Sequence, residues 1–113
     1  MLPLVPVITS VTLAELSVGP LVAASEVERA RRQAHLQQAE EAFDPLPFDA
    51  DAARVFGSVT ASLRQAGRKT RTRAKDAMIA STALANGLPV YTCNPGDFEG
   101  VDRLEVVPVR VPV

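Results

Sequence analysis

The feature that most constrains the fold is an apolar helix followed directly by a short strand, between Arg71 and Phe98. From about Arg73 to Asn86 the segment reads as a helix with almost no polar face, because Ala, Met, Ile and Leu fill most of its positions. Asn86-Gly87 is a typical helix end, since glycine readily adopts the left-handed conformation that stops a helix. Leu88–Cys93 follows as an apolar strand and is closed by a turn over 94–97. The pattern predicts a buried helix in the core of the protein.

The N-terminal half of the chain predicts one strand and two helices. Val5–Thr9 reads as a strand, and the next helix, capped by Ser10 or Thr12, should run to about Ala24 with a break at Gly19-Pro20. A second, charged helix begins after Ser25, whose spacing to Glu28 matches a capping box, and continues through Ala42 with most of its surface in water.

The C-terminal half predicts another helix and a final strand around the apolar unit. Asp49 is a good N-cap, and a single apolar stripe follows at helical spacing: Ala52, Phe56, Val59, Leu63 and Ala66. Leu104–Val109 reads as the last strand. Strands that alternate with helices predict an α/β fold, a mainly parallel sheet flanked by helices, in a single domain over residues 1–113.

The composition indicates the cellular compartment of the protein but says little about its binding partner. The chain has 12 Lys and Arg against 13 Asp and Glu, so its net charge indicates no partner, but basic side chains gather over 64–75. The single Cys93 rules out an internal disulfide and a cysteine-rich metal site, as is typical of a reducing cytoplasm. Leu2–Val11 has no basic leader, is broken by prolines and is too short to span a bilayer. We therefore expect a soluble cytoplasmic protein with no membrane partner.

Four polar residues are the candidates for a functional site. Glu15 and Asp76 lie in the predicted first turns of two helices, while Asn94 and Asp97 follow a strand. In an open parallel sheet, ligands bind where strands end and helices begin, so these side chains should converge at one edge. Oxygen ligands without His or Cys suit Mg²⁺ or Mn²⁺, which can activate water for attack on a phosphodiester. The neighbouring basic residues, which would bring a polyanion to the metal, are Arg68, Arg71, Arg73 and Lys75.

Each of these residues also has a purely structural interpretation. Glu15 would complete a capping box that begins at Thr12, and Asp76 is favoured near a helix N-terminus whatever else it does. Asn94 and Asp97 are ordinary turn residues. The basic run can equally be a solvated loop.

Three sequence blocks together resemble the PIN-domain ribonuclease toxins of the VapC type. They are ITSVTLAELSVG, FDPLPFDADAARVFGSVTASLRQAGR and DAMIASTALANGLPVYTCNPGDF. The resemblance implies a type II toxin–antitoxin component, a metal-dependent endoribonuclease that binds Mg²⁺ or Mn²⁺ at the edge of a parallel sheet. It also implies a VapB-type antitoxin partner and a homodimer. On this resemblance Glu15 and Asp76 are catalytic, and the metal ligands are Glu15, Asp76, Asn94 and Asp97.

In one respect the chain departs from the family pattern. The family opens with a central strand that ends in a metal-binding Asp, ahead of the block that here begins at Val5, so we expect the sheet to lack that strand. One alternative is therefore a catalytically impaired remnant that acts only as an antitoxin- or toxin-binding module. A second alternative is an unrelated small α/β binding domain whose acidic residues are all helix caps.

Overall fold

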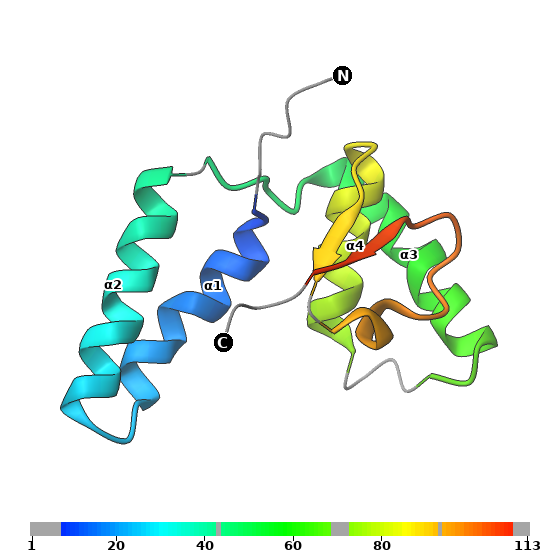
Figure 1. The fold of residues 1–113 in the computed structure, drawn as a ribbon. Helices are drawn as coiled ribbons and strands as arrows, with labels where there is room; N and C mark the ends of the chain where they lie inside the picture. The colour runs from blue at the N-terminus through cyan, green and yellow to red at the C-terminus, as the bar shows by residue number, and fades with distance from the viewer. Residues whose placement is uncertain (1–7, 43, 69–72, 93, 110–113) are drawn as a thin grey trace. The chain divides into compact units, whose positions relative to one another are not determined.

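The computed structural model describes residues 8–42, 44–68, 73–92 and 94–109 of the chain. Three sequence predictions fall partly outside these residues, namely the strand over Val5–Thr9, the RNA contact of Arg71 and the strand over Leu88–Cys93. The chain divides into two compact units, Met1–Pro47 and Phe48–Val113 (Figure 1). The expectation of a single domain stays a prediction.

The first unit is a helical hairpin. Its elements are α1 (Ser10–Val18), the short 3₁₀ helix η1 (Gly19–Val22) and α2 (Glu26–Ala42), which runs back alongside α1 (Figure 1). The predicted break at Gly19-Pro20 is confirmed, because α1 stops at Val18 and Pro20 is buried in η1. α2 faces mainly water, as predicted, since Ala39 is its buried residue.

The cap of α1 differs from the prediction. Thr9 is the N-cap, and its hydroxyl accepts a hydrogen bond from the Thr12 N–H at 3.0 Å, so Ser10 and Thr12 were the wrong choices. The reason lies in the backbone: Thr9 forms a parallel bridge with Leu46, and the Ser10 N–H donates to the Leu46 carbonyl at 2.8 Å. This pairing holds Thr9 in the extended conformation that an N-cap requires. Of the strand predicted over Val5–Thr9, the described residues show one β-bridge, the one between Thr9 and Leu46.

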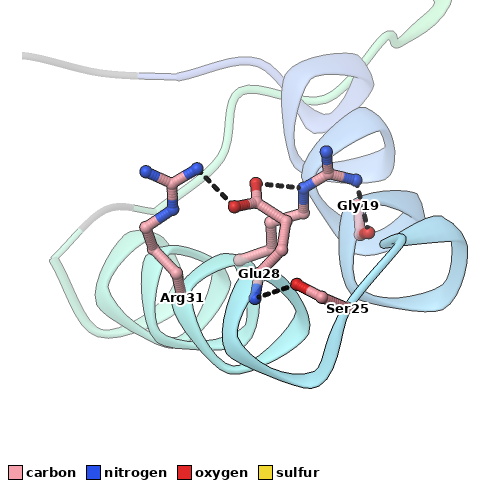
Figure 2. A network of polar contacts seen from close by, with 5 residues as sticks. Gly19, Ser25, Glu28 and Arg31 are labelled. Carbon is pink, nitrogen blue, oxygen red and sulfur yellow. Dashed lines mark hydrogen bonds and ion pairs between the residues drawn. The ribbon is translucent and has the colours of Figure 1, made fainter.

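A polar network joins α2 to Gly19, the first residue of η1 (Figure 2). Ser25 caps α2 by accepting a hydrogen bond from the Glu28 N–H at 3.1 Å, as the sequence predicted. The Glu28 carboxylate accepts hydrogen bonds from Arg31 and Arg32, and Arg32 also donates to the Gly19 carbonyl at 2.9 Å. Hydrogen bonds from Arg31 and Arg32 lower the pKa of the Glu28 carboxyl below its ordinary value.

The second unit carries the sheet. Its elements are α3 (Ala50–Gln65), α4 (Ala74–Ala85), β1 (Val90–Thr92), the 3₁₀ helix η2 (Pro95–Phe98) and β2 (Val106–Pro108) (Figure 1). Asp49 caps α3 by accepting from the Ala52 N–H at 3.0 Å, as predicted. β1 and β2 run parallel, with Val90 opposite Val106. The predicted α/β class with a parallel sheet is confirmed, although β1 begins at Val90 instead of Leu88 and β2 is shorter than the sequence indicated.

The core of this unit lies between α3, α4 and the sheet. Val59 and Leu63 of α3 are buried, and the cluster that contains them also holds Ala77, Ala80, Ala83, Val90 and Phe98. The predicted stripe of α3 is wrong at Ala66, which is exposed because it is the C-cap beyond the last turn of the helix.

The middle of α4 is buried, as the sequence predicted. Its two buried hydroxyls are satisfied within the helix, since Ser81 donates to the Ala77 carbonyl and Thr82 to the Met78 carbonyl. Gly87, with φ of 66°, ends the helix turn in the left-handed conformation. In the part of the chain that the structure describes, no helix combines the length and apolarity needed to cross a membrane.

Candidate functional site

Two of the predicted acidic residues lie on elements that the core of the second unit fixes in place. Asp76 is in the first turn of α4, directly before the buried Ala77. Asp97 is in η2, directly before Phe98, which is only 6% exposed and belongs to the core cluster. Each carboxylate is therefore attached to a backbone held by its apolar neighbour, and η2 packs against α4.

Arg73 brings these two carboxylates to one point. A single nitrogen of its guanidinium group lies 3.0 Å from an Asp97 carboxylate oxygen and 3.7 Å from an Asp76 carboxylate oxygen. Asp76 and Arg73 are about equally exposed, at 29% and 30% of their side chains, so the cluster is at the surface but partly shielded from solvent. The convergence predicted for Asp76 and Asp97 is thus seen, with an arginine between them.

A second arginine, Arg68, also contacts the η2 segment. Arg68, which follows α3, donates to the Gly96 carbonyl at 2.7 Å and lies 3.6 Å from the Glu99 carboxylate. Arg68 and Arg73 were both predicted to bind RNA, and both make contacts within the protein instead of pointing only to solvent. Lys75 is exposed on α4.

The other two predicted ligands have different positions. Asn94 precedes η2 as its N-cap and is exposed, and its backbone N–H donates to the Thr92 hydroxyl at 3.0 Å. Glu15 lies in the middle of α1, in the first unit; the first turn of that helix contains no acid. Both structural expectations for Glu15 are therefore wrong: it is not in a first turn, and it does not complete a capping box.

Comparison with known proteins decides the family. Residues 4–104 match the family model of the PIN domain. The chain belongs to the PIN-domain family. It is 43% identical over 94 residues to ribonuclease VapC5 of Mycobacterium tuberculosis, a match that spans 83% of this chain and 67% of the relative. It is 32% identical over 102 residues to ribonuclease VapC4 of the same organism, spanning 90% of this chain and 75% of the relative.

A solved structure supports the same assignment. The crystal structure of VapBC-5 from Mycobacterium tuberculosis, a member of the VapBC family of toxin–antitoxin systems, superposes with a TM-score of 0.80 at 37% identity. The superposition covers 91% of this chain and 81% of that chain. The resemblance inferred from the three sequence blocks is thus confirmed, and this PIN domain is of the VapC type.

PIN-domain ribonucleases in general depend on a divalent metal, and the Asp76–Asp97 cluster fits such an ion. Carboxylate oxygens are the ligands that hard divalent cations prefer, and Mg²⁺ is commonly held by only one or two carboxylates together with water. Among the described residues, no group of three or more His, Cys, Asp or Glu side chains is close enough to hold a metal. Within the second unit, the fit is therefore to a site with two carboxylates.

The contacts that Arg68 and Arg73 make within the protein were not predicted from the sequence. Arg73 and Asp97 are 24 positions apart, so no local pattern links them. One signal was present: Arg73 stands three residues before Asp76, the spacing at which opposite charges meet on a helix.

Proposed function

We propose that this PIN domain is a divalent-metal-dependent endoribonuclease, the toxin of a VapBC-type toxin–antitoxin pair that acts in the cytoplasm. The observation that carries the proposal is the meeting of Asp76 and Asp97 around one positive charge, in a chain 43% identical to a ribonuclease of the VapC type. Two carboxylates that meet at a partly shielded surface repel one another, so they need a positive charge beside them. Arg73 supplies that charge in the structure, and a divalent cation could supply it in its place.

Asp76 and Asp97 would hold the metal, which we take to be Mg²⁺ or Mn²⁺. Asn94, the N-cap of η2, completes the ligand set that we propose within the second unit, with Asp76 as a catalytic carboxylate. The catalytic and metal-binding roles of Glu15, which lies in the first unit, stay predictions from the sequence. When bound, such an ion stabilises the negative charge that develops on the phosphodiester during hydrolysis. The protein's own contribution is to fix its carboxylates before the substrate arrives: α4 sets Asp76, and the buried Phe98 sets Asp97.

The basic residues around the cluster would act on the RNA backbone. Lys75 is exposed on the same helix turn as Asp76 and can meet a phosphate directly. Arg68 and Arg71 belong to the same basic segment of the sequence. We propose this set, with Arg73, as the surface along which RNA approaches.

The proposed partners are an RNA substrate and a VapB-type antitoxin, with the toxin as a homodimer. The neighbouring structure of VapBC-5 is a toxin–antitoxin system, which supports the antitoxin partner. A binding module without catalysis is the weaker alternative, because the curated relatives are named ribonucleases.

Replacement of Asp76 by Asn tests the proposal, because it removes one charge and keeps the shape. We expect Asp76→Asn to slow Mn²⁺-dependent cleavage of a labelled RNA by about a hundredfold or more, equivalent to several kcal/mol of transition-state stabilisation.

Asp51→Asn is the matched control for that variant. Asp51 is also in the first turn of a helix and also pairs with an arginine three positions away, Arg54 at 3.1 Å, but it lies outside the cluster. It should cleave like the parent. Equal cleavage by the Asp76→Asn variant and its parent would contradict the proposed site.

A further inference from the structure

Arg73 stands where a positive side chain is locally unfavourable. It is the N-cap of α4, and it makes no side-chain capping hydrogen bond. The N-terminus of a helix already carries a partial positive charge from its unpaired N–H groups, so a guanidinium there is repelled. The helix alone gives no reason for an arginine at this position.

The compensation comes from the two carboxylates of the candidate metal centre. The same guanidinium nitrogen faces both of them, at 3.0 Å from Asp97 and 3.7 Å from Asp76. A divalent ion bound to the same oxygens would sit about 2.0–2.6 Å from them. The ion and the guanidinium would then compete for one space and for the same negative charge.

We propose that Arg73 is the internal counter-ion of Asp76 and Asp97, which a divalent cation has to displace in order to bind. This inference rests on the proposed function, because it assigns the metal to these two carboxylates. In the absence of metal, Arg73 holds the repelling carboxylates together. Arg73 is 30% exposed, and its long flexible stem lets the charged end move into solvent when the ion enters.

The competition between Arg73 and the metal predicts the direction in which Mn²⁺ affinity should change when Arg73 is replaced. A positive charge a few ångströms from a divalent ion weakens its binding, and its removal should tighten Mn²⁺ binding on the order of tenfold at a site this close to water. If Arg73 served only to hold η2 in place, its replacement would loosen η2 and leave the Mn²⁺ affinity unchanged or weaker.

Arg68 provides the matched control. It ties the same η2 segment through the Gly96 carbonyl and Glu99, whereas the guanidinium that faces Asp76 and Asp97 is that of Arg73. Arg68→Gln should therefore relax η2 without removing the cation that competes with the metal. Arg73→Lys keeps the positive charge and tests whether charge is what matters.

The experiment is a titration with Mn²⁺, followed by the loss of the free-ion electron paramagnetic resonance signal, on the parent, Arg73→Gln, Arg73→Lys and Arg68→Gln. We expect about tenfold tighter binding for Arg73→Gln and near-parent affinity for the other two. If Arg73→Gln does not fold, as judged by circular dichroism, Arg73→Met keeps the apolar stem and replaces it.

Parent-like or weaker binding by the neutral variant would overturn the inference while leaving the metal site in place. Tighter binding by Arg68→Gln of the same size would also overturn it, because the effect would then belong to the mobility of η2. A parent that binds no Mn²⁺ would instead contradict the proposed function, and the inference with it.

Discussion

Gly100, just after the segment that carries Asp97, offers a quantitative test of how η2 is held. Its φ is 94°, a backbone conformation that side chains rarely adopt, and a Cβ built on it would lie 2.8 Å from the Cβ of Ala66. The left-handed backbone costs an ordinary residue about 1–2 kcal/mol, and forcing a fixed methyl group into packed atoms costs about 1–3 kcal/mol more. We therefore expect Gly100→Ala to destabilise the protein by about 2–5 kcal/mol.

A double-mutant cycle separates the two contributions. Ala66→Gly removes the atom that the new methyl group meets but leaves the backbone strain, so in that background Gly100→Ala should cost only about 1–2 kcal/mol. The assay is urea unfolding followed by circular dichroism. Gly57→Ala is the control: Gly57 lies within α3, a Cβ there meets nothing within 4 Å, and the change should stabilise by about 0.5–1 kcal/mol. Equal losses for Gly100→Ala in both backgrounds would refute the predicted clash.

Two further predictions concern charge. Because the folded pKa of Glu28 is lowered below its ordinary value of 4.5, its contribution to stability is present above that value and is lost as pH falls through the lowered pKa. Glu28→Gln should thus lower the melting temperature near neutral pH and make progressively less difference as the pH is lowered below 4.5, and a constant difference would contradict this. Lys75→Gln should flatten the slope of log RNA affinity against log salt concentration by a few tenths to about one unit, whereas the control Arg54→Gln on α3 should leave that slope unchanged. An unchanged slope for Lys75→Gln would assign that side chain to an ordinary solvated surface.

Local patterns in the sequence predicted much of the second unit. The apolar period of α3, the Asp49 cap and the glycine after α4 each reflect a preference that acts within a few residues, and the structure has all three. α4 was predicted from its lack of a polar face, and its centre is buried as that composition requires.

The errors arose where distant residues decide the outcome. Thr9 and Thr12 are both competent caps, and only the bridge from Thr9 to Leu46 selects the first. The pairing of Arg73 with Asp97 was missed because Asp97 comes much later in the chain. Sequence spacing thus identified the two carboxylates of the cluster but not the arginine that lies between them.

The central claim is that Asp76 and Asp97 bind one divalent cation. Isothermal titration with Mn²⁺ on the parent, Asp76→Asn, Asp97→Asn and Asp51→Asn tests it most directly. Each lost carboxylate removes a ligand and a charge from the ion, so both cluster variants should bind at least about tenfold more weakly. Asp51→Asn should bind like the parent. Parent-like Mn²⁺ affinity in Asp76→Asn and Asp97→Asn would contradict the account.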